Sequence, residues 1–350
     1  MSVSPLDNRP VFIGVVWQRI RKHENAVREA LARRFAILHE LELQWSRRRF
    51  RRHIQELFGL DGWLASWSRT LRCGRGPFRV LVLEGGTPED VESAQADIRR
   101  VTGCAEAVHL SRTAAETDAQ AKILLGVGMK RWLELVQRIS TSELKLLGRG
   151  TRRTAYDIPG SGLCLKCYIR TAAKAYVAGE ISAFRFNVDR NACAQEGRYF
   201  QELRKRLPSD LLAAFPATLE LVALPEYGWS LVEERLANAD GSALEKLSAV
   251  YRSASPERRA SLVSAFRKLM EGIVRCGVKF YDPQNVLVQW LGGSGEGEFR
   301  LRIVDFEPES RTLLSPDAIC PALIRAKVRR REQRFLKRRL GWSENTTEGE

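Results

Sequence analysis

The first third of the chain alternates between two hydrophobic periods. Apolar runs of strand character occur at residues 11–18, 36–45, 77–86 and 106–111. The segments between them have the 3.6-residue spacing of amphipathic helices, and residues 23–35 place Val27, Leu31 and Phe35 on one side. This order of strand, helix, strand and helix predicts an α/β domain in which helices pack on a parallel or mixed sheet.

In parallel sheets, binding residues gather at the carboxyl ends of the strands. The residues at the carboxyl ends of the predicted strands are Trp17, Gln18, Glu84, Gly85 and Gly86. An ordinary turn is a sufficient explanation of the last three, because neither G-x-G-x-x-G nor a P-loop occurs in this part of the chain. The sequence therefore predicts a fold for the first third and assigns it no chemistry.

The pattern changes after a polar segment at residues 137–144. Three strands separated by turns are predicted, then a helix, then two further strands, in residues 144–169, 191–207 and 218–236. Two helical stretches between residues 242 and 276 follow. A β-rich segment followed by a helical one is the order of a bilobal protein-kinase-like fold.

We therefore expect two domains, which is also what a length of 350 residues suggests at about 150 residues per domain. The first, residues 1–137, is an α/β domain of unassigned role. The second, residues 138–350, is a protein-kinase-like α+β domain that ends in a basic helix.

The first candidate site residues lie in the three-stranded segment. Gly148 and Gly150 fall between two strand patterns, where glycines let the backbone approach phosphates. Lys166 lies within an apolar strand, and burying an ammonium group requires an anionic partner. Glu196, in the middle of the next helix, can be that partner, as a helix Glu is in kinases. The alternatives are an ordinary hairpin and a Lys that extends to water at a strand edge.

Other candidates follow along the chain in the order that a kinase requires. An apolar strand leads into Glu233 and Glu234, whose backbone groups would face an adenine ring as a kinase hinge does. Asn285 and Asp305 stand where kinases hold Mg²⁺. The catalytic-loop Asp expected five residues before Asn285 is replaced by Phe280, which leaves Asp282 as a displaced base.

Cys164 and Cys167 have the C-x-x-C spacing of redox and zinc sites. Residues three apart on a strand point to opposite faces, and no second Cys pair with zinc spacing follows. We interpret both as packing residues. The four His have no ligand spacing either, so no metal site is expected from them.

These motifs resemble the PhoP regulatory network protein YrbL family, a branch of the protein-kinase-like superfamily. The matching stretches, within about residues 142–342, are "LGRGTRRTAYDIPGSGLCLKCY", "YGWSLVEERLANADG", "VKFYDPQNVLVQ", "IVDFEPES" and "RREQRFLKRRLGW". The resemblance implies a kinase-like fold in which Lys166, Glu196, Asn285 and Asp305 bind nucleotide and Mg²⁺. Glu307 replaces the Gly of Asp-Phe-Gly, and members of the family tend to lack the catalytic-loop Asp as well.

Charge adds a class of partner. The net charge of +15 is concentrated at residues 46–53 and 325–340, which suggests an anionic partner such as a glycan, a lipid headgroup or a protein that docks on the basic tail. A solvated helical face explains each run equally well. Nucleic acid is the weakest alternative, because no known nucleic-acid module is present.

The remaining composition places the protein in the cytoplasm. The seven Cys are scattered and odd in number, which favours reduced thiols over a disulfide framework. The sequence contains neither an apolar run of membrane-spanning length nor the pattern of a signal peptide, so no membrane span is expected.

Two functions are compatible with these patterns. In the first, the protein binds ATP and Mg²⁺ and phosphorylates a small-molecule or glycan acceptor, and the loss of the base at Phe280 argues for slow catalysis. In the second, it is a pseudokinase, a regulatory or binding module without phosphotransfer.

Overall fold

A computed structural model describes residues 9–45, 47–61, 63–106, 108–150, 153–168, 191–217, 219–278, 282–292, 297–305 and 321–342. The chain forms two compact units. Unit 1 comprises Met1–Ser161, Leu165–Ala194 and Glu220–Val232, and unit 2 comprises Gly162–Cys164, Gln195–Leu219 and Glu233–Glu350. None of the helices within the described ranges combines the length and the apolar character that crossing a bilayer requires.

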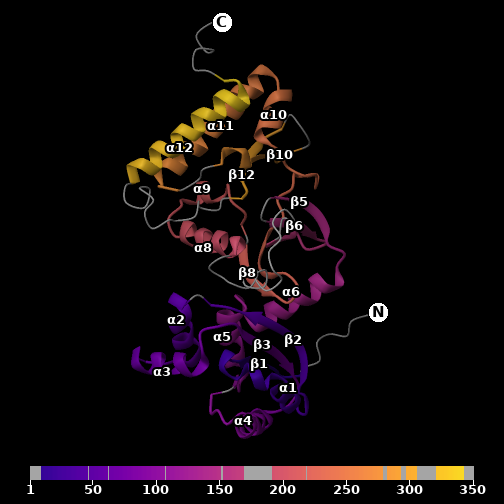
Figure 1. The fold of residues 1–350 in the computed structure, drawn as a ribbon. Helices are drawn as coiled ribbons and strands as arrows, with labels where there is room; N and C mark the ends of the chain where they lie inside the picture. Colours follow the sequence, from indigo (N-terminus) through magenta and orange to yellow (C-terminus); the bar gives the residue numbers. More distant parts are fainter. Residues whose placement is uncertain are drawn as a thin grey trace. The chain divides into compact units, whose positions relative to one another are not determined.

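Unit 1 begins with a four-stranded sheet of spatial order β2-β3-β1-β4 (Figure 1). Its strands are β1 (Val11–Val16), β2 (Ala36–Leu43), β3 (Phe78–Glu84) and β4 (Val108–Leu110). Every pairing in this sheet is antiparallel. The strands are joined by the 3₁₀ helix η1 (Gln18–His23), α1 (Glu24–Ala32), α2 (Arg47–Phe58), α3 (Trp63–Cys73) and α4 (Pro88–Thr102).

The connections of this sheet are those of the ferredoxin-like, split β-α-β arrangement. α1 carries the chain from β1 to β2 and α4 carries it from β3 to β4, and each of these crossovers skips one strand of the sheet. α2 and α3 are an insertion between the neighbouring strands β2 and β3. The observed class of this domain is therefore α+β.

The prediction of a parallel or mixed sheet is wrong. Alternating strands and helices define the order of the elements, but they do not determine which strands become neighbours. Here the strand that each crossover skips runs in the opposite direction. The register pairs Val11 with Glu84 and Val16 with Arg79, so Trp17 lies at the opposite edge of the sheet from Gly85 and Gly86. The residues at the predicted carboxyl ends form no common site for that reason.

One face of the sheet is covered by α1 and α4, whose apolar sides pack together. Val27 and Leu31 of α1 belong to one buried cluster with Val91 and Ile98 of α4 and with Phe12 of β1. The predicted buried side of the first helix is thereby confirmed. α4 begins with a capping box between Thr87 and Asp90 and ends at Gly103, whose positive φ closes the helix.

Unit 1 also contains most of a second sheet, of order β5-β6-β7-β9-β8. Its strands are β5 (Lys145–Arg149), β6 (Arg153–Ile158), β7 (Leu163–Tyr168), β8 (Leu219–Leu224) and β9 (Gly228–Glu234). The strands and turns predicted in this part of the chain are present. α8 (Ala192–Arg204) follows β7 in the sequence, beyond the residues that the structure leaves undescribed.

α5 (Ala114–Leu124) and α6 (Met129–Thr141) connect the two sheets within unit 1. The indole Nε1 of Trp132 in α6 donates a hydrogen bond of 2.7 Å to the carbonyl of Ala223 in β8. The amide of Ala223 donates in turn to the carbonyl of Leu125, at 2.9 Å. The expected boundary between residues 137 and 138 falls inside α6, and unit 1 continues beyond it.

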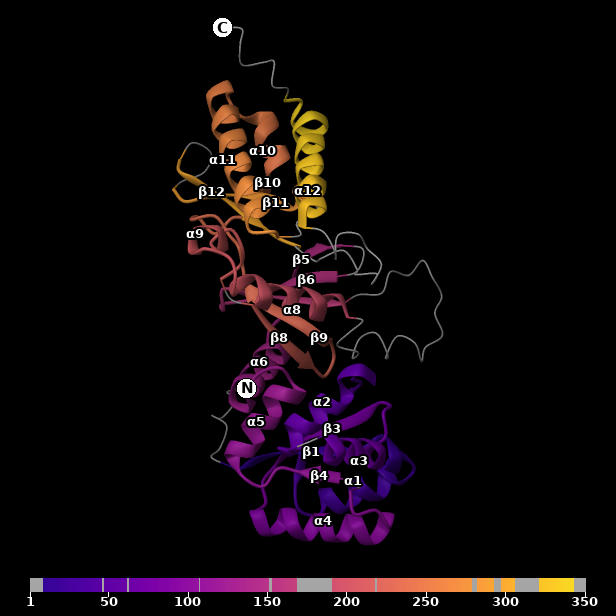
Figure 2. The same cartoon turned by 90° about the vertical axis from the view of Figure 1, so that its left-hand side faces the viewer.

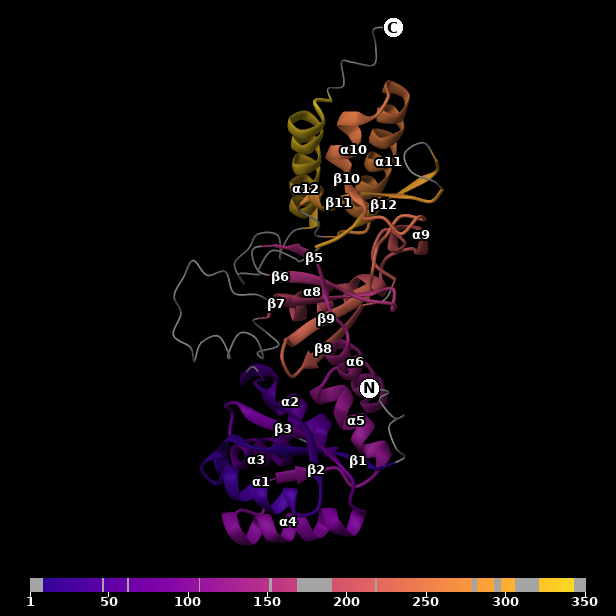
Figure 3. The same ribbon diagram turned by 90° about the vertical axis from the view of Figure 1, so that its right-hand side faces the viewer.

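Unit 2 is mainly helical. Its elements include α9 (Ser209–Leu212), α10 (Leu247–Ser253), α11 (Pro256–Arg275), α12 (Pro321–Phe335) and the π-helical turn η4 (Leu336–Leu340). Figure 2 and Figure 3 show α10, α11 and α12 side by side. The rings of Phe266 in α11 and Phe335 in α12 lie 5.2 Å apart, so the basic last helix packs on α11 through its apolar side.

A small sheet completes unit 2, with the order β10-β11-β12. Its strands are β10 (Glu245–Lys246), β11 (Val286–Trp290) and β12 (Phe299–Ile303). The 3₁₀ turn η2 (Pro283–Asn285) leads directly into β11.

Candidate functional site

Asn285 and Asp305 lie together at one end of the β11–β12 pair. The antiparallel register pairs Val286 with Ile303, so the residues just outside the pair are neighbours. The amide of Val304 donates to the carbonyl of Asn285 at 3.1 Å, and Nδ2 of Asn285 donates to the carbonyl of Asp305 at 3.3 Å. Two oxygen-bearing side chains predicted to hold a metal are thus brought to one place by two short strands.

Asp305 has an uncommon backbone conformation. Its φ is 55°, and it is the one non-glycine residue with a positive φ in the described part of the chain. Asp and Asn adopt this region more readily than other residues, at a cost of about 1–3 kcal/mol. Such outliers concentrate at functional sites, and this one falls on a residue that the sequence singled out independently.

Asp282 begins the turn that holds Asn285. Its Oδ1 accepts a hydrogen bond from the amide of Gln284 at 3.2 Å, and its carbonyl accepts one from the amide of Asn285 at 3.1 Å. The side chain is exposed. Asp282 is therefore accessible to a substrate, and it also caps η2.

A cavity of about 280 Å³ opens beside Asp282. It is lined by Asp282, Pro283, Gln284 and Phe335, and by four arginines, Arg331, Arg334, Arg338 and Arg339. Within the described residues, Arg334, Arg338 and Arg339 form no ion pair with a carboxylate, and all three are exposed. One carboxylate and four guanidinium groups give this cavity a positive field, which favours an anionic occupant.

Two residues central to the sequence argument lie outside the described residues. They are Phe280, which replaces the usual catalytic Asp, and Glu307, which follows Asp-Phe. The contribution of both to the site stays a prediction.

The glycine turn lies between β5 and β6. Gly148 pairs with Ala155 after a bulge, and the amide of Gly150 donates to the carbonyl of Arg153 at 2.8 Å. Neither glycine has a positive φ, and a Cβ added to Gly148 would meet no atom within 4 Å. The fold itself therefore does not require glycine at residue 148.

The strand that carries this turn exposes apolar side chains. Leu146 is 61% and Leu147 is 46% exposed, although both precede the glycines in a strand. Exposed apolar area of this kind is typical of a surface that a ligand or partner covers.

Lys166 lies in β7 and is buried, with only 7% of its surface exposed. Its backbone carbonyl accepts a hydrogen bond from Sγ of Cys193 in the first turn of α8, at 3.4 Å. Glu196, three residues beyond Cys193 on the same side of α8, is fully buried. The two predicted partners are thus both buried charged residues, and an ion pair between them stays a prediction.

The side chains of Glu233 and Glu234 have structural contacts. Oε2 of Glu234 accepts a hydrogen bond from the amide of Ala217 at 2.6 Å and pairs with Nη2 of Arg302 at 3.0 Å. Burial lowers the pKa of Arg302, while the carboxylate of Glu234 opposes that shift. The hinge role that the sequence predicts concerns the backbone of residues 233 and 234, and it stays a prediction.

The two cysteines of the C-x-x-C spacing are buried in β7. Sγ of Cys164 lies 3.7 Å from Oε1 of Glu233, and Sγ of Cys167 lies 3.7 Å from the carbonyl of Thr154. The contacts of the two thiols thus lie in different places, as the strand period requires. No group of three or more His, Cys, Asp or Glu in the described ranges is arranged to hold a metal.

The predicted residues divide between the two units. Gly148, Gly150 and Lys166 belong to unit 1, whereas Glu196, Glu233, Glu234, Asp282, Asn285 and Asp305 belong to unit 2. Within unit 2, the structure brings together Asp282, Asn285 and Asp305.

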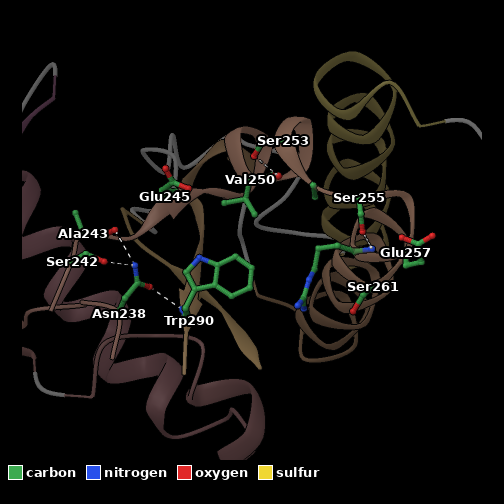
Figure 4. Close-up of a pocket in the computed structure, with 12 residues that line it drawn as sticks. Asn238, Ser242, Ala243, Glu245, Val250, Ser253, Ser255, Glu257, Ser261 and Trp290 are labelled. Atoms are coloured by element: carbon green, nitrogen blue, oxygen red, sulfur yellow. Dashed lines mark hydrogen bonds between the residues drawn. The ribbon is translucent and has the colours of Figure 1, made fainter. Parts of the chain in front are cut away.

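A larger hollow of about 990 Å³ in unit 2 was not indicated by any sequence motif. It lies between the residues before α10, the start of α11 and β11, and Figure 4 shows Asn238 at its edge. Nδ2 of Asn238 donates to Ser242 Oγ and to the carbonyl of Ala243, at 2.9 and 3.2 Å, and its Oδ1 accepts from the amide of Trp290 at 2.8 Å. The side-chain amide of Asn238 is therefore engaged in holding this loop.

No model of a known protein family matches the sequence, and no curated protein has significant sequence similarity to it. The resemblance to the YrbL family therefore rests on the short motifs alone.

Proposed function

We propose that the protein is a kinase-like phosphotransferase that binds ATP with Mg²⁺ and acts on a small or glycan-type acceptor bearing an anionic group. The observation on which this proposal rests is the pairing of Asn285 with Asp305 next to Asp282 and the arginine-lined cavity. Loop Asn and strand-end Asp are the pair of metal-binding side chains that protein kinases use.

The residues present fit a magnesium ion bound together with a nucleotide. Mg²⁺ takes oxygen ligands, and in nucleotide sites one or two protein side chains suffice, because phosphates and waters complete the octahedron. Nδ2 of Asn285 faces the carbonyl of Asp305, which leaves its Oδ1 as the ligand atom. The exposed carboxylate of Asp305 would supply the second oxygen.

The second sheet supports the assignment of the nucleotide residues. Kinases have a glycine-rich turn between the first two strands of their small lobe, a Lys on the third strand and a Glu on the following helix. Gly148 lies near the end of the first strand of the β5-β6-β7-β9-β8 sheet and Gly150 directly follows that strand, Lys166 is on the third strand, and Glu196 is on α8. Lys166 would hold the phosphates and Glu196 would orient Lys166.

Phosphotransfer would proceed by in-line displacement. The acceptor oxygen would form a bond to the γ-phosphorus while the bond from that phosphorus to the β–γ bridging oxygen breaks, and ADP would leave. Asp282 would accept the proton of the acceptor hydroxyl. Arg334 and Arg338 would hold the anionic part of the acceptor beside Asp282, since they line the same cavity.

A pseudokinase is the second candidate, and two observations favour it. Phe280 occupies the position of the usual base. Asp282, the replacement, already accepts a hydrogen bond from Gln284 as the cap of η2. General base catalysis contributes about 10²–10⁴-fold in rate, so an enzyme with an impaired base would be slow.

The experiment is thermal unfolding with ATP, with and without Mg²⁺, in the wild type, in Asp305→Asn and in Asp210→Asn. Asp305→Asn keeps a residue that tolerates positive φ and removes the charge, whereas Asp210 is an exposed control in α9. Ligand at 100 times its Kd should add about 2.7 kcal/mol of stability to the wild type and to the control.

Absence of a Mg²⁺-dependent shift in the wild type would overturn the proposal. A shift that requires Asp305, together with no ADP formation in the presence of sugar and sugar-phosphate acceptors, would assign the protein to the pseudokinases.

A further inference from the structure

A second cavity, of about 310 Å³, lies within unit 1, in the domain to which the sequence assigned no chemistry. α2, α3, α4, β4 and the start of α5 all contribute to its wall. Its volume is at the lower end of the range of small-molecule sites, which is about 300–1,000 Å³.

Three of the four carboxylate oxygens in the wall of this cavity accept hydrogen bonds from the protein, and Oε2 of Glu106 is buried without one from any described residue. Glu106 accepts hydrogen bonds from Arg69 and from Nη1 of Arg72, the latter at 2.9 Å. Glu116 accepts from the amide of Arg112 and from Nε2 of Gln120, each at 2.8 Å. The three arginines of the wall, Arg69, Arg99 and Arg112, outnumber its two carboxylates, so the cavity favours an anion over a cation.

His109 is a neutral member of the cavity wall. Burial, and then the nearby Arg69 and Arg112, lower the pKa of His109 to about 4, so the ring is neutral at pH 7. Nε2 of Gln120 lies 2.6 Å from Nε2 of His109, and the same amide nitrogen donates to Glu116. The carboxylate of Glu116 can only accept a hydrogen bond, so the atom of Gln120 that faces it is the NH₂ nitrogen. The same nitrogen faces His109 and donates to Nε2 of the ring. The proton of His109 is therefore on Nδ1.

Several donors in the wall have no acceptor among the described residues. Gln95 is 6% exposed, lines the cavity and forms no hydrogen bond with a described residue. Nε of Arg99 donates to the carbonyl of Ala105 at 3.1 Å, and the guanidinium groups of Arg99 and Arg112 have no carboxylate partner within the described ranges. The amide of Gln95 and these two guanidinium groups can therefore donate to a ligand.

The remaining wall is apolar and includes two large aromatic rings. The ring of Phe58 lies 4.7 Å from His109 and 6.1 Å from Trp17. The guanidinium group of Arg69 lies over the ring of Phe58, 4.2 Å from the ring centroid. An apolar wall opposite several convergent donors is the usual composition of a site for a small organic molecule.

We propose that this cavity binds a small organic anion, with a carboxylate or phosphate group held by Gln95, Arg99 and Arg112 and an apolar body against Phe58. This site is independent of the proposed phosphotransfer, because it lies entirely in unit 1 and shares no residue with the nucleotide candidates.

The test is a titration followed by NMR of protein labelled only at its four histidines. The His109 signal is assigned by its loss in His109→Gln. Phenyl phosphate and phenylacetate serve as anionic probes, and benzyl alcohol and benzylamine serve as the neutral and cationic ones. The matched variants are Arg99→Gln and Arg112→Gln, and the control is Arg100→Gln, which is exposed on α4 and bonded to Asp97.

A saturable shift of the His109 signal is expected with one or both anions. The anion that binds more tightly shows whether the site prefers a phosphate or a carboxylate group. Arg99→Gln and Arg112→Gln should each weaken binding about tenfold or more, because each removes a charged donor, and Arg100→Gln should not. The other three His signals report whether each variant is folded. No saturable shift with either anion, an equal response to benzyl alcohol or benzylamine, or unchanged affinity in folded Arg99→Gln and Arg112→Gln would overturn the proposal.

Discussion

Asn285 donates a hydrogen bond of 3.3 Å from its side-chain amide to the backbone carbonyl of Asp305, twenty residues further along the chain. The structure therefore brings together Asn285 and Asp305, the two residues that we propose bind Mg²⁺. The antiparallel register of β11 and β12 places the two residues side by side. The proposed nucleotide binding by Asn285 and Asp305 and the proposed proton transfer by Asp282 can therefore be tested separately.

Asp282→Asn should separate catalysis from nucleotide binding. Asn keeps an oxygen that can accept the hydrogen bond from Gln284, so the turn should stay folded. We expect phosphotransfer to fall by about 10²–10⁴-fold, with the Mg²⁺·ATP stabilisation unchanged. ADP release measures the first quantity and thermal unfolding the second. Equal rates in the wild type and Asp282→Asn would show that Asp282 is not the base.

Gly148→Ala should affect ligand binding more than folding. Its φ is not positive and no atom lies within 4 Å of the added Cβ, so the free energy of unfolding should change by less than about 1 kcal/mol. The stabilisation by Mg²⁺·ATP should decrease, because the backbone can then approach the phosphates less closely.

Gly126→Ala is the matched contrast for Gly148→Ala. Gly126 has a φ of +92°, and an added Cβ would lie 1.9 Å from the carbonyl oxygen of Leu221. Urea unfolding should show a loss of more than about 2 kcal/mol at residue 126 and almost none at residue 148. Equal losses of unfolding free energy in the two variants would contradict the prediction that residue 126 requires glycine and residue 148 does not.

Arg302→Ala should destabilise unit 2. Arg302 is buried, and its guanidinium bonds Glu234, the carbonyl of Phe215 and the side chain of Gln289 at 3.0–3.1 Å. Removing one partner of a buried pair costs about 3–5 kcal/mol, and partial exposure of Glu234 favours the lower value. Arg300→Ala, at an exposed position of the same strand, should cost under about 0.5 kcal/mol. Similar urea midpoints for the two variants would refute the structural role of Arg302.

His109 should make stability depend on pH below neutrality. Its pKa of about 4 in the folded protein is below its ordinary value of 6.5, so between these values the unfolded chain binds a proton that the folded chain does not. Stability therefore falls as the pH is lowered through this window, by up to about 3 kcal/mol. His109→Gln should remove this part of the pH dependence in urea unfolding between pH 7 and pH 4.5, and an unchanged slope would contradict it.

Hydrophobic periodicity predicted the local elements well, because burial on one side of a helix or strand is encoded within a few residues. Val27 and Leu31 are buried as expected, and the predicted strands on both sides of Gly148 pair. Strand direction could not be predicted in this way, because it depends on which strands become neighbours. No local pattern in the sequence indicates that β3 lies between β1 and β2 in the sheet. α3 was not predicted either.

The candidate site divides in the same way. Asn285 and Asp305 were predictable because each stands at a fixed offset from a strand. The arginine-lined cavity was not, although the basic tail was recognised, because only packing of the last helix brings Arg334 and Arg338 to Asp282. The cavity of unit 1 combines Phe58, Gln95 and His109 from different elements, each unremarkable in its own segment.

The insertion of α2 and α3 contributes to the cavity wall, whereas the strands on either side of it form the sheet. An antiparallel pair such as β2 and β3 needs only a short hairpin, so the hydrogen bonds between these strands do not depend on the inserted helices. The insertion nevertheless supplies Phe58 and Arg69 to the cavity wall. Substitutions on the cavity side of this segment can therefore alter which molecule is accepted while the strand pairing is preserved, so ligand selectivity and the scaffold are free to evolve independently.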